Sequence, residues 1–288
     1  MRAAEPRGAE GREARLAYGM VTPAIATILL VALFPLGWTV WESFHLHDLR
    51  MPWLGRPFVG LENYAEVLQD RRFWGAMAHT AWFAAASVSL ELVVGCALAL
   101  AMNRTFRGRT LVRLSILIPW AIPTVVAALV WRFMFEGLEG GWLADDTRAW
   151  VPIILADAWK ETPFVALLLL AGLQGIDPAL YEAARIDGAS AWRQFRHVTL
   201  PLLAPAIMVA LIFRTMNAFR VFDLIYVLTG GGPGTATEPI SLYTFNSLMH
   251  NLRFGYGSTL SVLVFLVTFG LALGYIRLLG RGLTETRA

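Results

Sequence analysis

The chain has 288 residues, of which 57% are hydrophobic and 16% are charged, and its mean hydropathy is +0.55. A soluble domain needs a polar surface that this composition cannot provide, so the sequence excludes a soluble domain and predicts a protein of the lipid bilayer. The formal net charge of +3 is distributed around apolar segments and not along one face, which argues against a nucleic-acid partner.

The chain begins with a polar tail, residues 1–15, followed by six apolar segments. Each segment has the roughly 20 residues that a helix needs to cross the hydrocarbon core. The first is longer than a signal-peptide core and lacks a small-residue cleavage site, so we expect a retained helix. The sequence therefore predicts an all-α, polytopic membrane protein with one transmembrane domain over residues 16–288. The six predicted spans are 16–41, 76–102, 111–135, 151–173, 200–228 and 257–279.

The basic residues between the spans predict the orientation. The segments on the side of the two termini carry 14 arginines, and those on the opposite side carry 6. By the positive-inside rule the side richer in arginine faces the cytoplasm. We therefore expect both termini, including the tail, in the cytoplasm.

The first external connection carries two features. Residues 58–64 and 70–74 predict a short amphipathic helix along the outer surface, anchored by aromatic side chains. Before it, His45, His47 and Asp48 lack the further ligands of a metal centre, and we expect solvated loop residues. The single cysteine, Cys96, lies in an apolar span and cannot form an intrachain disulfide, so the sequence predicts neither a metal site nor a disulfide.

Polar side chains inside the predicted spans are candidate functional residues, because a charge in hydrocarbon is costly and usually faces a cavity or a partner helix. Glu91 in the second span is expected to face the protein interior, although the sequence indicates no partner. The fourth span opens with Asp157-Ala158-Trp159-Lys160-Glu161-Thr162-Pro163, in which the proline is expected to kink the helix beside a cavity. Candidates for a substrate pathway here are Trp159, Lys160 and Thr162.

Residues 177–201 form a polar island between the fourth and fifth spans. Asp177 is a favourable helix cap, Pro178 suits the first helical position, and Gly188 supplies the left-handed residue that ends the helix. Ser190 can cap a second short helix. The sequence predicts a helix, a glycine bend and another helix, here called the elbow segment, which could fill a groove on a partner protein.

The fifth span carries Arg214, Asn217, Arg220 and Asp223 at three-residue steps, which places them along one side of a continuous helix. Together with Tyr226 they complete the predicted substrate pathway. Asparagine, aspartate and arginine pair with hydroxyl groups, and aromatic rings offer flat faces to a sugar ring. The pattern therefore suits a carbohydrate.

Two other interpretations of these residues stay open. Lys160, Glu161, Arg220 and Asp223 could instead form ion pairs that hold the helices together. Arg214 and Arg220 would also suit an anionic substrate such as a glycerol phosphate.

Two sets of glycines have structural interpretations. The run 229–235 lacks the Lys-Ser/Thr continuation of a nucleotide loop and is expected to end the fifth span in a tight backbone reversal. Gly270 and Gly274 form a small-residue pair in the sixth span that would allow close approach of another helix.

The elbow segment also carries a resemblance. Glu182-Ala183-Ala184, Gly188 and Val198-Thr199-Leu200-Pro201 reproduce the spacing of the cytoplasmic loop in the membrane subunits of bacterial ABC importers, which usually have isoleucine at the position of Val198. The glycine run after the fifth span resembles the carbohydrate-importer branch, which handles maltose, trehalose and related glucosides. The resemblance covers nearly all of the chain.

The resemblance implies a permease subunit that passes a di- or oligosaccharide across the cytoplasmic membrane by alternating access. It implies as partners a second homologous permease, two ATP-binding subunits and an external substrate-binding protein. The elbow segment would be the coupling helix, in which Glu182 and Arg185 contact the ATPase and Gly188 preserves the bend. The residues expected to take part in this coupling are Glu182, Ala183, Ala184, Arg185, Gly188, Leu200 and Pro201.

The chain is not predicted to be an enzyme. Its sequence has no phosphate-cradling Walker loop, and Lys160 is its only lysine. ATP and Mg²⁺ are therefore expected on the partner ATPase, and no cofactor on this chain. A secondary transporter is the less favoured alternative, because it would show an internal inverted repeat and would leave the elbow segment unexplained.

Overall fold

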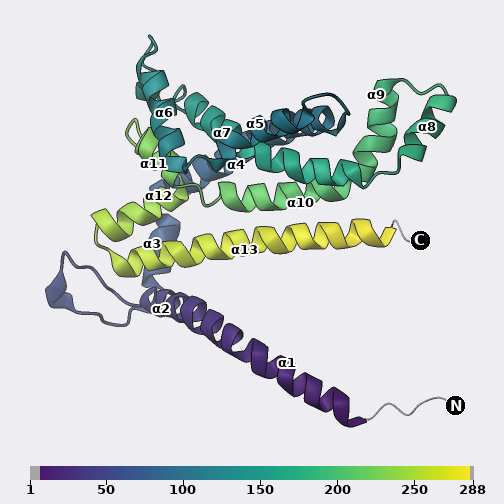
Figure 1. Cartoon of the computed structure of the whole chain (residues 1–288). Helices are drawn as coiled ribbons and strands as arrows, with labels where there is room; N and C mark the ends of the chain where they lie inside the picture. Colours follow the sequence, from purple (N-terminus) through teal and green to yellow (C-terminus); the bar gives the residue numbers. More distant parts are fainter. Residues whose placement is uncertain (1–6, 286–288) are drawn as a thin grey trace. The chain divides into compact units, whose positions relative to one another are not determined.

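The computed structural model describes residues 7–285, with side chains over 16–277, and it confirms the all-α class (Figure 1). The α-helices of the described part are α1 (Arg7–Ile28), α2 (Phe34–Glu42), α3 (Glu62–Gln69), α4 (Arg71–Asn103), α5 (Arg109–Ala121), α6 (Thr124–Glu136), α7 (Trp150–Gln174), α8 (Pro178–Ile186), α9 (Ala191–Gln194), α10 (Leu200–Ala218), α11 (Asp223–Leu228), α12 (Ile240–Phe245) and α13 (Phe254–Glu285). Short π-helical turns cover Leu29–Leu33, Phe195–Thr199 and Asn246–His250, and 3₁₀ turns cover Pro52–Leu54 and Trp142–Ala144.

The chain divides into two compact units. The first comprises residues 1–67 and 247–263, and the second comprises 68–246 and 264–288. The helix α13 contributes to both. All the residues of the predicted pathway and of the elbow segment belong to the second unit.

The first predicted span is helical throughout. The helix α1, the π turn Leu29–Leu33 and α2 follow one another through Pro23 and Pro35. A stretch of 27 residues within them, Leu16–Glu42, is long and apolar enough to cross a bilayer. The helix begins at Arg7, inside the tail predicted for residues 1–15, and residues 1–6 lie outside the described part.

The loop after α2 corrects one expectation. His47 and Asp48 are not solvated: Nδ1 of His47 pairs with the buried carboxylate of Glu42, and Asp48 is only 6% exposed. Asp48 accepts hydrogen bonds from Nε and Nη2 of Arg50, at 2.9 and 2.6 Å. The amphipathic helix predicted from residues 58–64 and 70–74 matches α3 only in part, because α3 covers Glu62–Gln69 and Arg71 already begins α4. The amide of Asn63 in α3 donates to the backbone oxygen of Ser43 at 2.9 Å. The polar groups of the loop therefore satisfy one another.

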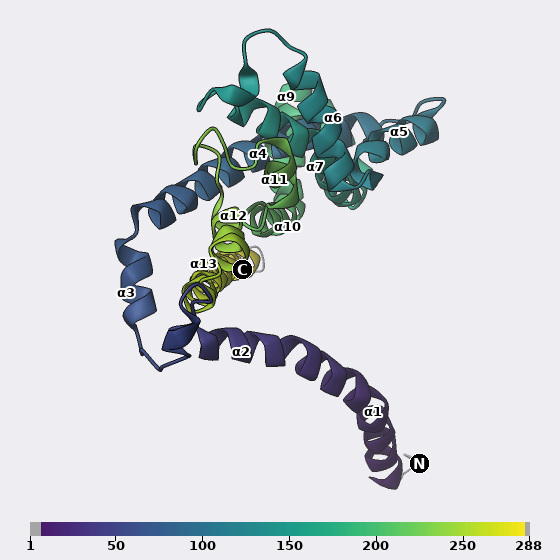
Figure 2. The same cartoon turned by 90° about the vertical axis from the view of Figure 1, so that its left-hand side faces the viewer.

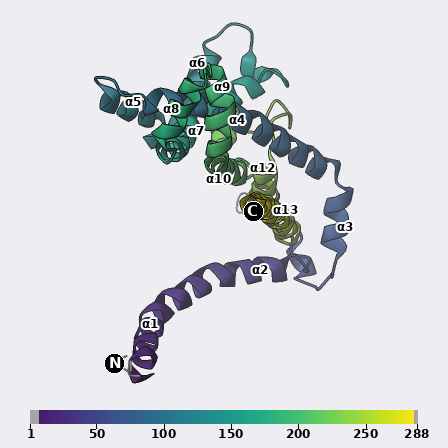
Figure 3. The same ribbon diagram turned by 90° about the vertical axis from the view of Figure 1, so that its right-hand side faces the viewer.

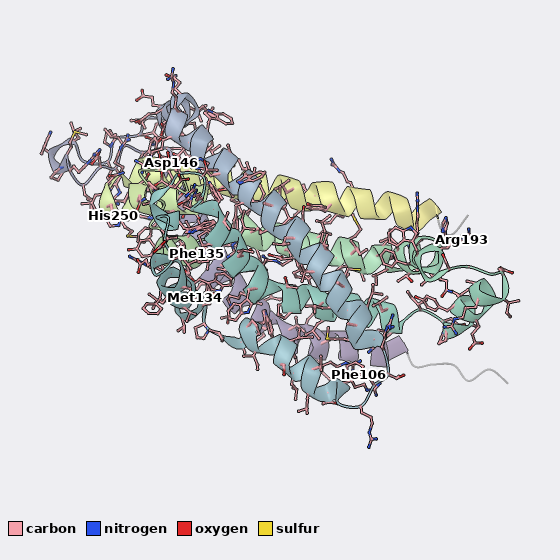
Figure 4. All side chains as sticks on the ribbon, turned by 90° about the horizontal axis from the view of Figure 1, so that it is seen from above. Phe106, Met134, Phe135, Asp146, Arg193 and His250 are labelled. Carbon is pink, nitrogen blue, oxygen red and sulfur yellow. The ribbon has the colours of Figure 1, made fainter. Side chains whose placement is uncertain are left out.

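The second unit has a core of three long helices. In both Figure 1 and Figure 4, α4, α7 and α10 lie side by side, and each contacts the other two. Two glycines permit this closeness. A Cβ on Gly95 of α4 would lie 2.8 Å from Cγ1 of Val165 on α7, and one on Gly172 of α7 would lie 2.6 Å from Cβ of Ala206 on α10. Alanine at either position would force the helices apart.

The other predicted glycine roles have different outcomes. The run after α11 does end the fifth span, since Gly230, Gly231 and Gly234 adopt φ values of +64°, +88° and +56°. For Gly270 and Gly274, in contrast, an added Cβ would meet nothing within 4 Å. The pair therefore makes no close helix contact within the described part of this chain.

Two predicted spans are broken and not straight. The third consists of α5 and α6, which meet at 90°, because Pro123 disfavours a helical conformation at Ile122 and the chain there becomes extended. The fifth ends as a helix at Ala218, and the chain turns before α11, which packs beside α6 (Figure 2). Both breaks face the same region of the unit, where the polar side chains gather.

The connections of the second unit are divided between its two ends. Figure 4 shows Phe106, in the loop between α4 and α5, and Arg193, in α9, toward one end, and Phe135, at the end of α6, toward the other. In Figure 3, α8 and α9 lie at the end of the unit nearest the viewer. The arginine-rich connection after α4 and the elbow segment therefore share one end.

Candidate functional site

A polar cavity lies in the second unit where α10 ends and α11 begins. The chain turns over residues 219–222, and the backbone N–H of Arg220 donates to the carbonyl of Asn217 at 3.0 Å. The cavity has a volume of about 210 Å³. Its walls are formed by Thr124, Asp157, Lys160, Glu161, Arg214, Asn217, Ala218, Arg220, Val221, Phe222, Asp223 and Leu224.

The buried guanidinium of Arg214 forms the inner wall of the cavity. Its Nε and Nη2 donate to the two carboxylate oxygens of Glu91 on α4, the second at 2.7 Å. Nη2 also donates to Asp157 Oδ2 at 3.0 Å, and Nη1 lies 3.5 Å from Oε2 of Glu161. Three carboxylates from two neighbouring helices thus surround one cation. Because a buried charge is stable only when it is paired, this arrangement fixes the guanidinium in place.

The ammonium of Lys160 is held by the break in the third span. Its Nζ donates to the carbonyl of Ile122 at 2.9 Å and to that of Trp120 at 3.3 Å. These carbonyls are left free because the helix α5 ends there. Nζ is also 3.9 Å from Oε1 of Glu161. The broken helix therefore supplies hydrogen-bond acceptors that an unbroken span would have used internally.

The mouth of the cavity presents side chains that are available to a ligand. Asn217, Arg220 and Asp223 are exposed, and their side chains make no hydrogen bond or ion pair with any described residue. The carboxylate of Glu161 has two cations nearby but accepts no hydrogen bond within the described part. The opening therefore carries both hydrogen-bond donors and acceptors.

The elbow segment has the predicted local structure. Asp177 caps α8 by accepting from the N–H of Ala179 at 2.9 Å, and Gly188 has the left-handed φ of +73°. Ser190 Oγ accepts from the N–H of Arg193 at 3.4 Å. One feature differs from the prediction: the second helix is not separate, because α9 continues through the π turn Phe195–Thr199 into α10.

The elbow segment exposes both apolar and charged side chains. Ile186 is 86% and Trp192 69% exposed, and the side chains of Glu182 and Arg185 are exposed too. Leu200 and Pro201 begin α10 where the elbow ends.

The comparisons with known proteins identify the family. The sequence profile described as "Binding-protein-dependent transport system inner membrane component" matches residues 91–283, which include the cavity and the elbow segment. The chain belongs to this family. It is 44% identical over 281 residues to the trehalose/maltose transport system permease protein MalF of Thermococcus litoralis, covering 92% of this chain and 94% of that protein. It is 42% identical over 283 residues to the trehalose transport system permease protein SugA of Mycobacterium tuberculosis, covering 95% and 91%.

A solved structure shares the fold. A bacterial ABC transporter involved in the import of the acidic polysaccharide alginate has a chain that superposes with a TM-score of 0.79 at 23% identity, covering 96% of this chain and 99% of the other. The family profile and the relatives, and not this likeness of fold, show that the chain is a permease subunit of an ABC transporter. It is a transport subunit and not an enzyme, and ATP is hydrolysed by separate subunits. Within its described residues, no group of three or more metal-ligating side chains occurs.

The permease brings together five of the predicted pathway residues and separates three. Lys160, Arg214, Asn217, Arg220 and Asp223 line the cavity. The last four were predicted along one side of a single helix, and this was wrong because α10 and α11 are separate helices. The residues nevertheless lie together around the cavity, as predicted. Arg214 was expected to contact the substrate, but its guanidinium is already paired with three carboxylates.

The remaining three lie elsewhere. Trp159 and Thr162 line an apolar groove of about 390 Å³ on another side of α7, where Trp159 meets the edge of Trp131 at 6.1 Å between ring centroids. Tyr226 stacks on Phe222, at 5.3 Å between ring centroids, outside the cavity lining. The alternative ion-pair interpretation also proves partly right, since Lys160 approaches Glu161, whereas Arg220 and Asp223 pair with no described residue.

Three acidic residues were missing from the predicted pathway. Asp157 and Glu161 line the cavity, and Glu91 supports it from behind. The sequence carried a signal for all three, because acidic residues inside apolar spans require cationic partners there, and Arg214 lies in another such span. It did not indicate which partners meet, since that depends on how α4, α7 and α10 pack.

Proposed function

We propose that this permease passes an uncharged di- or oligosaccharide of the trehalose or maltose type across the inner membrane by way of the polar cavity. The observation that carries the proposal is the set of side chains at the cavity mouth. Asn217, Arg220 and Asp223 offer donors and acceptors with no partner among the described residues, and hydroxyl groups are both. The relatives named for trehalose and maltose transport support this substrate class.

The size of the cavity favours a shared site. Pockets that enclose a whole small ligand commonly measure about 300–1,000 Å³. The 210 Å³ found here would hold only part of a disaccharide. A second, homologous permease would supply the rest of the pathway.

An anionic substrate such as a glycerol phosphate fits the geometry less well. Arg214 is the most deeply placed cation of the cavity, and three carboxylates already surround it. An incoming phosphate would have to compete with those carboxylates and would be repelled by Glu161. The charges of the wall therefore favour a neutral ligand.

The elbow segment is proposed to couple transport to ATP hydrolysis. It would face the cytoplasm together with both termini, as the 14 arginines on that side favour. There Ile186 and Trp192 would enter a groove on one of two ATP-binding subunits, with Glu182 and Arg185 making polar contacts at the rim. ATP and Mg²⁺ would be bound by those subunits. An external binding protein would deliver the sugar, and nucleotide would shift the pore between states by its differential affinity for them.

The test is sugar uptake and sugar-stimulated ATP hydrolysis by the reconstituted complex. Glu182→Ala and Gly188→Pro are expected to lose both activities and to lose retention of the ATPase, with membrane insertion unchanged. Glu139→Ala, an exposed residue of the connection after α6, is the matched control. Normal uptake and normal ATPase retention in both elbow variants would refute the coupling role.

A further inference from the structure

Among the described residues of the cavity, Arg214 has an ion-pair partner that does not itself line the cavity. Asp157 and Glu161 line the cavity themselves, whereas Glu91 does not. Glu91 is completely buried on α4, and both of its carboxylate oxygens accept hydrogen bonds from Arg214. Because Glu91 is fully buried, it does not contact a ligand in the cavity. Any effect of Glu91 on substrate binding is therefore exerted through Arg214.

The pairing also orients the guanidinium. Nε and Nη2 point to Glu91 and Asp157, which leaves Nη1 toward Glu161 and the cavity. Each of the three guanidinium nitrogen atoms of Arg214 therefore already faces a carboxylate, and Nη1 lies 3.5 Å from that of Glu161. A cation held in this way offers little attraction to an anion.

The charges around the cavity show what removing Glu91 would do. Lys160, Arg214 and Arg220 oppose Asp157, Glu161 and Asp223 on the lining, so the lining alone is balanced. The carboxylate of Glu91 adds one negative charge directly behind the wall. Without it, the guanidinium would be less neutralised, and charges at these distances interact strongly because little water separates them.

We propose that Glu91 is a specificity-determining residue, which keeps Arg214 neutralised so that the cavity accepts uncharged sugars and rejects anionic ones. Glu91 is here a positioning residue acting through Arg214. The inference rests on the proposed function, because it assumes that the cavity binds the sugar.

The experiment measures ligand binding to the reconstituted complex without the external binding protein, so that the selectivity of that protein does not enter. The probes are trehalose, trehalose 6-phosphate and inorganic phosphate. Glu91→Gln, which keeps the shape of the side chain, is expected to bind trehalose 6-phosphate about tenfold or more tightly than the wild type does. Its affinity for trehalose should stay within about threefold of the wild-type value.

The double variant Glu91→Gln/Arg214→Gln is the decisive control, because the gain must disappear when the guanidinium is removed. A gain that persists in the double variant would place the anion on Arg220 or Lys160 and overturn the proposal. So would an assembled Glu91→Gln complex without any gain. A gain for inorganic phosphate as well is expected, because a less neutralised guanidinium attracts either anion.

A second variant covers the case in which Glu91→Gln does not assemble. Asp157→Asn removes another carboxylate from Arg214 at the edge of the cavity, where burial is less complete, and the proposal expects the same direction of change. If Asp157→Asn binds no more sugar phosphate than the wild type, the proposal fails. Failure of the wild type to bind trehalose would instead refute the proposed function on which the inference rests.

Discussion

The cavity wall and the elbow segment are built in opposite ways. The wall is held by long-range pairs: Arg214 lies 123 residues from Glu91 and 57 from Asp157 along the chain. The bends of the elbow are held mostly by contacts within a few residues, namely the caps Asp177 and Ser190 and the left-handed Gly188. Most of its side chains are exposed, whereas the ion-paired side chains of the inner wall are buried. The wall therefore depends on the whole unit, and the elbow largely on itself.

This contrast predicts that the largest loss of stability follows a change in the wall. Arg214→Leu would leave the carboxylates of Glu91, Asp157 and Glu161 without their main partner. Breaking a buried pair from one side costs about 3–5 kcal/mol. We expect a much lower thermal unfolding temperature and yield for the purified complex.

The double variant Arg214→Leu/Glu91→Leu is the control for this loss. It replaces the most buried pair with apolar side chains, and such replacements are often neutral. It should recover part of the stability. An Arg214→Leu complex as stable as the wild type would show that the wall does not depend on these pairs.

A change at the bend of the elbow should lower the stability less than a change in the wall, and it should affect binding of the ATPase and not of the sugar. An added Cβ on Gly188 meets nothing within 4 Å, so Gly188→Ala is opposed only by its φ of +73°. That conformation costs an alanine roughly 1–2 kcal/mol. We expect weaker retention of the ATPase and slower uptake, with sugar binding unchanged.

Gly19→Ala is the matched control, because Gly19 also has open space around it but lies within the helix α1. It should have no effect on either readout. Loss of sugar binding in Gly188→Ala would mean that the elbow and the cavity are not separately built.

The caps of the elbow should have smaller effects that follow their geometry. Asp177→Ala removes an acceptor 2.9 Å from its donor, at a cost of about 1 kcal/mol. Ser190→Ala removes one at 3.4 Å and should cost less. Hydrogen exchange of the amides in α8 and α9 measures both. Asp177→Asn retains the cap and should protect α8 almost as well as aspartate; equal exchange in Asp177→Ala and the wild type would contradict the prediction.

The smallest expected effect concerns the first unit and depends on pH. The hydrogen bonds from Arg50 hold the pKa of Asp48 below its ordinary value of 3.8. A carboxyl whose pKa is lowered by folding stabilises the fold above its ordinary pKa and loses that contribution as the pH falls through the lowered value. The effect is modest because Arg50 is half exposed.

The stability of wild type and Asp48→Asn, measured by unfolding between pH 6 and pH 3, checks this sign. The wild type should be the more stable at pH 6, and the difference should narrow below about pH 4. A difference that grows on acidification would contradict it.

The same contrast decides how much could be predicted from the sequence. The elbow was predicted in detail because Asp177, Pro178, Gly188 and Ser190 act on neighbouring backbone groups, and their spacing in the sequence is their spacing in space. The grouping of Asn217, Arg220 and Asp223 was predicted too, although for a helix that in fact ends at Ala218. Residues only a few positions apart in the sequence stay close in space even when the helix between them is broken, so the predicted grouping remained correct.

The parts that depend on packing could not be predicted. The partner of Glu91 is set by how α4, α7 and α10 approach one another, which Gly95 permits between α4 and α7 and Gly172 between α7 and α10. Trp159 was assigned to the pathway because an aromatic ring offers a flat face to a sugar. It is the neighbour of Lys160 in the helix, however, and neighbouring residues of a helix point about 100° apart. Lys160 therefore lines the polar cavity, whereas Trp159 lines the apolar groove.

The continuation of α9 into α10 connects the elbow segment to the cavity wall by one helical stretch. The stretch Ala191–Ala218 is helical over 28 residues, which corresponds to a rod about 42 Å long. One end of the rod is the exposed elbow, and the other carries Arg214 and Asn217 to the cavity. A tilt imposed at the elbow would therefore displace the cavity wall, unless the rod bends at the π turn Phe195–Thr199 or at Pro205.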